Sequence, residues 1–412
     1  MGETALILRF TILATRALAI GSVFFAAASA MAQEASVPSP KGPASNLRET
    51  FEHTIIALKR IFEAPLHPVV TSIAPNGGIG AGVAYESPAR EGLKSSARTV
   101  YTAYNYWLAQ ATLGFEDRRG GIQAFGRVRE MGRLDYFGSG PNSSLSNRTS
   151  YSYRDPVIGA DARFRATPWL TVGGRAEHIW PYATSGERSP SIEQRFSTND
   201  AAGLFTRSQF GRYQASVDVR VPPGAGDAFY QGTRARTTYA VYDDRTLDLF
   251  NFSRLDLEAQ QIFAGLGTYH RLTLSGWLSR SITGAGQDVP FYFQRTLGGS
   301  SEVRGLQEYR LGSDGTEATL RGFRSLRFRD RNHLLLQAEY RLPVWDLLEA
   351  TVFGDAGKVA PRSSDLDLTD LRHDFGFSVS VMESWRTKAR VDVAFGSGEG
   401  AHIFFSFGRL TP

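Results

Sequence analysis

The chain of 412 residues contains no cysteine, which excludes a disulfide framework and thiol chemistry. Its formal net charge is only +5, so it has no dense basic patch and no nucleic-acid partner is expected. Beyond the N-terminal region, no apolar run reaches the ~20 residues that a membrane-spanning helix needs. Glycine and aromatic residues are plentiful, with 42 Gly and 12% Phe, Trp and Tyr. The length alone favours two or three domains, but a single all-β barrel can be longer than a typical domain.

The N-terminus resembles a secretory signal. Arg9 and Arg16 precede the apolar run ALAIGSVFFAAASAMAQ, which ends in small residues with an A-x-A type cleavage site near 30–33. A membrane anchor is the alternative, but the run is shorter than the ~20 apolar residues of a spanning helix. The sequence therefore predicts a signal peptide over 1–32 and a mature chain outside the cytoplasm.

Residues 33–76 are expected to form a linker that contains one short periplasmic helix. The segment 34–45, EASVPSPKGPAS, is rich in Pro and Ser. The segment 46–62 has apolar side chains at helical spacing, namely Leu47, Phe51, Ile55, Leu58 and Phe62. One such helix cannot build a core of its own. It either packs against the barrel rim, or plugs the lumen or docks a partner.

From residue 77 onward, apolar residues recur at every second position. In HLLLQAEYRL (333–342), Leu334, Leu336 and Leu342 alternate with polar and charged residues, and 373–382, 387–396 and 401–408 behave alike. Strands of ~10 residues with one apolar and one polar face are typical of transmembrane β-barrels. The strands of a soluble sandwich or propeller would also alternate between apolar and polar residues. The signal peptide, the charged second face and the Phe-rich C-terminal strand favour the barrel. We predict an all-β, antiparallel transmembrane barrel over 77–412, with sixteen strands, of which fourteen can be counted directly.

A charged cluster is expected inside this barrel. Arg304 lies between glycine-rich turns in TLGGSSEVRGLQEYRLGSDG (296–315). A buried arginine needs carboxylate partners, preferably in bidentate contact. The alternation places Glu339 and Asp355 on the inward face, with Asp392 as a third candidate. An ion cluster of Arg304 with these acids would fix a loop that reaches into the lumen.

The same stretch resembles the loop motif of the BamA/TamA-like superfamily of outer-membrane barrels, the bacterial surface-antigen family. Val303, Arg304 and Gly305 match its Val-Arg-Gly signature, although Leu306 stands where the family has an aromatic residue. AEYRLP (338–343), FGDAGKV (353–359) and ARVDVAFG (389–396) resemble three further strand motifs in the family's order. The resemblance implies a lumen-inserted loop whose Arg304 engages Glu339 and Asp355. Arg390 and Asp392, which share one face of 387–396, are possible additional lumen charges.

The resemblance also implies a weak seam between the first and last strands. NGGIGAGVAY (76–85) is expected to be the first strand, and glycine weakens a strand interior. The expected seam glycines are Gly78, Gly80, Gly82, Gly400 and Gly408. Close packing or a bulge would explain these glycines equally well, whereas a phosphate loop lacks the preceding strand and the Lys-Ser/Thr. Phe405 and Phe407 are the expected C-terminal assembly signal.

These features predict a non-enzymatic outer-membrane protein that needs no cofactor or metal. The expected function is to aid insertion or passage of proteins or lipids through the seam; the alternatives are a passive pore constricted by the loop and, third, a hydrolase. No Gly-x-Ser-x-Gly occurs, and the seven histidines lie in no recognisable catalytic or metal-binding spacing.

Family members carry periplasmic polypeptide-binding modules, for which 33–76 is too short. The expected partners are therefore outer-membrane lipid and lipopolysaccharide, an unfolded outer-membrane or secreted client, and a separate periplasmic protein or lipoprotein.

Overall fold

The structure of the protein is a computed structural model that describes residues 64–88, 92–221, 232–264, 270–299, 319–345, 347–383 and 386–407. These residues belong to a compact unit that spans 61–412. The predicted signal peptide and the 46–62 helix lie outside the described residues. In the described part of the chain, no helix is long and apolar enough to cross a membrane.

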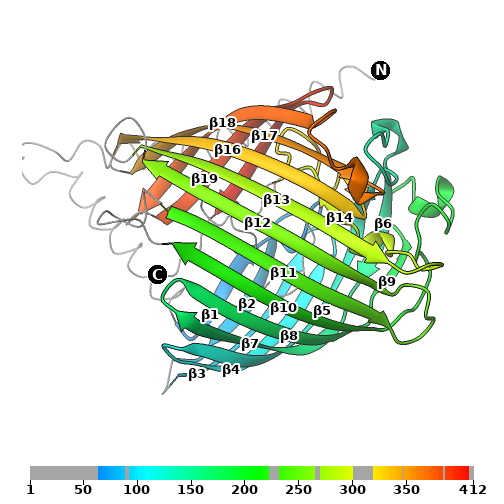
Figure 1. Cartoon of the computed structure of the whole chain (residues 1–412), viewed down its shortest axis with the longest axis horizontal. Helices are drawn as coiled ribbons and strands as arrows, with labels where there is room; N and C mark the ends of the chain where they lie inside the picture. Colours follow the sequence, from blue (N-terminus) through cyan, green and yellow to red (C-terminus); the bar gives the residue numbers. More distant parts are fainter. Residues whose placement is uncertain are drawn as a thin grey trace, which may run out of the picture. The chain divides into compact units, whose positions relative to one another are not determined.

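The described residues are mainly β-strands, which Figure 1 shows side by side. The strands of the wall are β1 (Leu66–Thr71), β2 (Gly80–Glu86), β3 (Leu93–Thr102), β4 (Trp107–Glu116), β5 (Gly120–Tyr136), β7 (Val157–Thr167), β8 (Leu170–Ile179), β10 (Phe210–Val221), β11 (Gly232–Asp244), β12 (Phe252–Ala264), β13 (Arg271–Thr283), β16 (Asn332–Trp345), β17 (Leu348–Ala360), β18 (Arg372–Glu383), β19 (Arg386–Gly396) and β20 (Gly400–Phe407).

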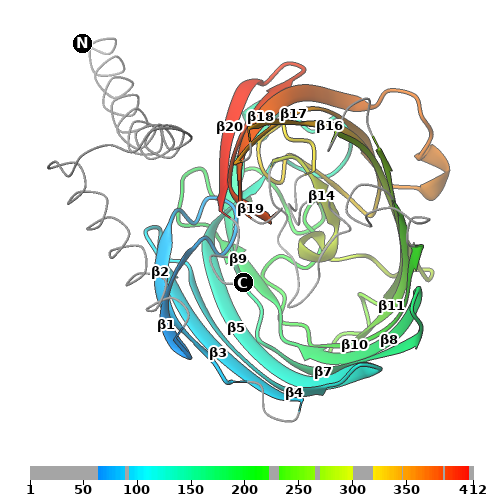
Figure 2. The ribbon, with the colours of Figure 1, turned by 90° about the vertical axis from the view of Figure 1, so that its left-hand side faces the viewer.

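Antiparallel ladders join these sixteen strands in chain order from β1 to β20 within the described residues. The sheet curves round into the ring seen in Figure 2. The ladders pair backbone groups that lipid could not satisfy. The structure confirms the predicted all-β antiparallel barrel.

One end of the barrel carries short turns, such as 117–119 between β4 and β5, and we call it the short-turn end. The opposite end carries the long connections, where the shorter elements lie. These are β6 (Thr149–Arg154), β9 (Tyr182–Ser185), β14 (Arg295–Leu297), β15 (Phe328–Asp330) and the 3₁₀ turns η1 (Leu145–Asn147), η2 (Ile192–Gln194), η3 (Phe291–Phe293) and η4 (Ser363–Asp365). β6 and β9 pair with each other beyond the wall, where β5 extends to meet β6.

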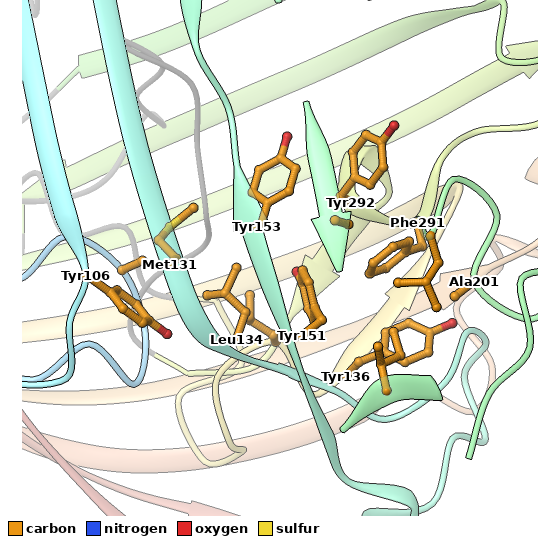
Figure 3. Close-up of a cluster of buried hydrophobic side chains, with 14 residues drawn as sticks. Tyr106, Met131, Leu134, Tyr136, Tyr151, Tyr153, Ala201, Phe291 and Tyr292 are labelled. Carbon is orange, nitrogen blue, oxygen red and sulfur yellow. The ribbon is translucent and has the colours of Figure 1, made fainter. Parts of the chain in front are cut away.

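A buried apolar cluster packs under the long connections (Figure 3). Tyr136, Tyr151 and Phe291 meet edge to face, with ring centroids 4.9 Å apart for Tyr151 and Phe291 and 5.3 Å apart for Tyr136 and Phe291. Such aromatic pairs add stabilisation beyond their buried area. Phe291 comes from the connection between β13 and β16, so the cluster holds this connection against β5 and β6.

The outer face of the wall is apolar, as the alternation predicts. Its exposed side chains include Val83, Leu113, Ile158, Val217, Tyr239, Val352, Phe377 and Ile403. The intervening residues point inward and are largely polar or charged; on β16, for example, Glu339 and Arg341 are buried while Leu336 is exposed. An apolar exterior around a charged interior is the arrangement that suits a lipid surround.

The start of the barrel differs from the sequence-based expectation. Residues 76–85 were expected to form the first strand, with the barrel beginning at 77, but β1 precedes them at Leu66–Thr71. β2 pairs with β1 on one side and β3 on the other. LHPVVT was missed because it is short and contains Pro68, which lowers strand propensity.

Candidate functional site

The described parts of the connection between β13 and β16, residues 284–299 and 319–331, enter the barrel. Figure 2 shows β14 inside the ring of wall strands. Gly298 and Gly299 have φ values of +118° and +81°, which only glycine adopts without strain. Two hydrogen bonds join Gly298 and Gly299 to Thr319. Gly298 N donates to Thr319 Oγ1 at 2.8 Å, and Thr319 N donates to Gly299 O at 3.0 Å.

Arg321 is the centre of the site. Its Nε and Nη2 donate to the two carboxylate oxygens of Asp355, both at 2.7 Å, and its Nη1 donates to Glu339 Oε1 at 2.5 Å. Its guanidinium also stacks on Phe353, with Cζ 3.5 Å from the ring centroid. Arg321 is only 1% exposed. A planar fork between two carboxylates and a ring is a geometry that arginine fills and lysine cannot.

The ion pairs continue along the inner wall from Glu339. Arg341 Nη2 donates to Glu339 Oε2 at 2.8 Å, and Arg390 Nη2 reaches Glu339 Oε1 at 3.4 Å. Arg390 also binds Asp392 at 2.8 Å. Glu349 accepts from Arg341 at 3.4 Å and from Arg271 at 2.8 Å. Buried charges are tolerated because each is paired, so removing one partner leaves another uncompensated.

The residues around Arg321 anchor the same segment by apolar packing. Leu320 and Phe323 belong to a buried cluster of Trp277, Leu297, Leu320, Phe323, Phe328, Leu335 and Val359. Gly322 packs against the wall so closely that a Cβ would lie 2.4 Å from Gly396 N and 2.5 Å from Asp374 Cβ. The segment Leu320–Phe323 therefore joins the wall through ion pairs, apolar contacts and backbone packing together.

A second tie links the loop to the turn between β19 and β20. Arg327 Nε donates to Glu399 Oε1, and Arg324 N donates to Glu399 Oε2 at 3.2 Å. Arg327 also donates to Ser143 O at 2.7 Å. Because Glu399 immediately precedes the last strand, the lumen loop and β20 are mechanically connected.

The structure brings together several of the residues of the sequence-predicted cluster, around a different arginine. Glu339 and Asp355 are buried on the inner wall and hold an arginine, and Arg390 and Asp392 join the same network. Val303, Arg304 and Gly305 lie outside the described residues. The arginine that the structure places between the two carboxylates is Arg321, which the sequence analysis missed. A signal was available, because Arg321-Gly322-Phe323 has the aromatic residue that Leu306 fails to supply.

The predicted seam glycines are only partly at an edge. Gly80 and Gly82 lie on β2, which has partners on both sides, so they do not line a seam. They permit close strand approach instead, since a Cβ at Gly82 would lie 1.9 Å from Thr99 O. Gly78 precedes β2 with φ +72°, Gly400 opens β20 with φ +82°, and Gly408 lies outside the described residues. Phe405 points outward from β20, and Phe407 is its last residue.

The two ends of the sheet are β1 and β20. Among the described residues, β1 pairs with β2 and β20 pairs with β19, and no ladder joins β1 to β20. Within the part of the chain that the structure describes, each of the two strands thus has one edge without a ladder partner. Such edges are templates for pairing with another chain.

No family model matches the chain, and no curated protein matches its sequence. Solved structures do match. BamA from Haemophilus ducreyi lacking POTRA domains 1–3 has a TM-score of 0.53 at 12% identity, covering 87% of this chain and 76% of that one. CdiB from Acinetobacter baumannii has a TM-score of 0.49 at 10% identity, covering 82% and 58%. OccK10 (OpdN) from Pseudomonas aeruginosa has a TM-score of 0.33 at 8% identity, covering 79% and 91%. The chain is thus similar in fold to the BamA barrel, an outer-membrane barrel.

Proposed function

We propose that this protein resides in the bacterial outer membrane and aids the insertion or passage of polypeptides across its seam. The observation that carries the proposal is the pair of edges on β1 and β20, which no described ladder joins. A client strand would pair with one of these edges by β-augmentation, which provides main-chain hydrogen bonds without regard to client sequence. The client's own folding into the bilayer would supply the driving force, so nothing is hydrolysed.

The lumen loop gives this seam a fixed support on one side. Arg321 holds the loop to β16 and β17, and Arg327 holds the same loop to Glu399 at the start of β20. Through these contacts the loop fixes β20 relative to the rigid wall. No ion pair ties β1 to the described part of the loop, although Ala74, just after β1, packs in the same apolar cluster as Phe291 and Leu326. We infer that the seam opens by movement of β1, while β20 stays in place as the template.

The proposed partners are lipid, a client polypeptide and a delivery protein. The apolar outer face would contact outer-membrane lipid, with lipopolysaccharide on the outside. The client would be an unfolded outer-membrane or secreted polypeptide. A separate periplasmic protein or lipoprotein would deliver it, and the 46–62 segment is a candidate docking element.

Locking the seam tests the proposal. The chain has no native cysteine, so engineered pairs report without background. Pairs scanned between β1 and β20, beginning with Val69→Cys and Phe404→Cys, would be oxidised and assayed for insertion of an unfolded barrel client into liposomes. The proposal predicts that oxidation abolishes the acceleration and that reduction restores it. The matched control is Val83→Cys with Thr99→Cys, a pair in register across β2 and β3, whose oxidation should change nothing. Full activity with a locked seam would refute the seam mechanism.

A passive pore is the second candidate. It is favoured by a polar cavity of about 610 Å³ on the inner wall at the short-turn end. A pore would show a large, steady conductance in planar bilayers, unchanged by Arg321→Ala and by seam locking. An assembly factor would show small or fluctuating conductance that the Arg321 variant increases, because the loop is freed.

A hydrolase is the least supported of the three candidate functions. His67, His178, His270 and His373 form hydrogen bonds through a ring nitrogen, with Ala64 O, Gln209, Tyr340 and Leu371 O respectively. None of these contacts is a serine hydroxyl. A nucleophilic serine requires such a base within hydrogen-bond reach.

A further inference from the structure

The cavity at the short-turn end of the lumen has more basic than acidic side chains in its lining. Its wall is formed by the ends of β3, β4, β5, β7, β8, β10 and β11, far from the Arg321 network in sequence. Among its lining residues, six are basic and four acidic. The basic ones are Lys94, Arg163, Arg165, Arg220, Arg234 and Arg236, and the acidic ones are Glu116, Asp117, Asp161 and Asp218.

The four acids already have partners within the described residues. Glu116 accepts from Lys94 at 2.7 Å, and Asp218 accepts from Arg236 at 2.8 Å. Asp161 accepts from Gln123 at 2.8 Å and lies 3.8 Å from Arg163, while Asp117 caps its own turn by accepting from the backbone N–H of Arg119. The acids therefore neutralise Lys94, Arg163 and Arg236 and leave the other three arginines.

Two of these remaining arginines face each other directly. Arg220 on β10 and Arg234 on β11 are cross-strand partners in the ladder, and both side chains point inward. The neighbouring row of the same ladder pairs Asp218 with Arg236, which is the ordinary opposite-charge arrangement. Like charges directly opposite one another destabilise a sheet. An anion bound between the two guanidinium groups would relieve this repulsion.

Arg165 at the end of β7 completes the set. Its backbone N–H donates to Arg119 O at 2.6 Å, but its side chain, like those of Arg220 and Arg234, has no ion pair with any residue that the structure describes. Trp169 lines the same cavity and gives it an apolar side. Three guanidinium groups around a water-accessible space are donors suited to bidentate recognition of an oxyanion.

We propose that Arg165, Arg220 and Arg234 form a binding site for the carboxylate or phosphate group of a small water-soluble ligand that enters the lumen from the short-turn end. This site is independent of the seam mechanism and of the Arg321 network. The anion bridges Arg220 and Arg234, and so relieves their repulsion. Its affinity falls as salt is added, because the cavity is open and ions screen the arginines.

Titration calorimetry on the full chain in detergent micelles tests the site, with citrate and pyrophosphate as probes and glycerol as the neutral comparison. We expect saturable binding of one or both anions and none of glycerol. Citrate alone would identify a carboxylate site, and pyrophosphate alone a phosphate site. Arg220→Gln and Arg234→Gln should each weaken binding about tenfold, the equivalent of one charge-assisted hydrogen bond. The matched control is Arg118→Gln, which removes the same charge from an exposed turn at the same end outside the cavity, and it should bind as the wild type does.

Thermal unfolding gives a second readout that separates a ligand site from a structural one. Without anion, Arg234→Gln should be at least as stable as the wild type, because a like-charge contact is removed. Citrate or pyrophosphate should then raise the melting temperature of the wild type more than that of the variant. The proposal is overturned if neither anion binds saturably, if the cavity variants bind as tightly as Arg118→Gln, or if Arg234→Gln is destabilised in the absence of anion.

Discussion

Arg321 and Asp355 form a two-pronged ion pair inside the barrel, with both N–O distances at 2.7 Å and both side chains buried. The pair joins a loop to a wall strand 34 residues further along the chain. Because Glu339 and Phe353 hold the same guanidinium, the loop has one defined position in the lumen. Several consequences of this geometry can be measured.

Removing the arginine should free the loop. Arg321→Ala leaves Asp355 buried without its arginine and removes one of the three arginine partners of Glu339. Breaking a buried pair costs about 3–5 kcal/mol. We expect a lower urea midpoint in detergent micelles and faster proteolysis of the loop. Arg321→Lys should restore little, since an ammonium cannot bridge both carboxylates. Arg324→Ala is the matched control, because that side chain is exposed in the same segment.

The sequence-based hypothesis about Arg304 stays a separate prediction. It expects Arg304→Ala to leave the barrel folded but to loosen the loop. The same proteolysis assay decides between the two arginines. Equal sensitivity of Arg304→Ala and wild type, together with rapid cleavage of Arg321→Ala, would assign the anchoring role to Arg321 alone.

The carboxylates and Arg321 should act as one unit. Asp355→Asn and Arg321→Ala each break the same contacts, so their combined effect on the free energy of unfolding should be smaller than the sum. A coupling of roughly 1–3 kcal/mol is expected for groups in one network. A double-mutant cycle measured by urea unfolding gives this value, and strict additivity would show that the contact contributes nothing to stability.

Gly322 should not tolerate a side chain. The Cβ of alanine would lie 2.4 Å from the backbone nitrogen of Gly396, which cannot move without disturbing the β19 end. Gly322→Ala should therefore lower the urea midpoint and expose the loop to protease. Gly354→Ala, whose Cβ would lie 3.7 Å from Asp374 O, is the control and should behave as wild type. Identical stability of the two variants would mean that the close packing does not constrain the loop.

Asp330, the last residue of β15, gives the loop a pH dependence. Burial, with Asp288 adding to it, raises the pKa of this carboxyl to about 6, from an ordinary value of 3.8. Between pH 3.8 and about 6 the folded state therefore keeps a proton on Asp330 that the unfolded state has lost. The stabilisation that this carboxyl contributes falls as the pH rises through 6. Asp330→Asn keeps the group neutral. It should be more stable than wild type at pH 7.5, with the difference disappearing at pH 4. A difference that is the same at both pH values would contradict this.

Much of the fold could be predicted from sequence, because alternation over β16 to β20 reports directly which face meets lipid. The same alternation predicts that Glu339 and Asp355 point inward, and both are buried. Arg321 could not be found this way, because its segment is not a strand and has no period. Two arginine-glycine pairs lie in one loop, and only the aromatic residue after Gly322 distinguishes them. β1 was missed because six residues with a proline carry too weak a signal.

The most direct measurement of the central claim is the rate at which an unfolded barrel client inserts into liposomes that contain this protein. Wild type and Arg324→Ala should accelerate insertion, and Arg321→Ala should lose most of the acceleration while remaining folded by its heat-modifiable mobility. This result would establish an assembly role that depends on the anchored loop. Equal rates with Arg321→Ala and wild type, or no acceleration even when the periplasmic fraction of the same envelope is added, would contradict the account.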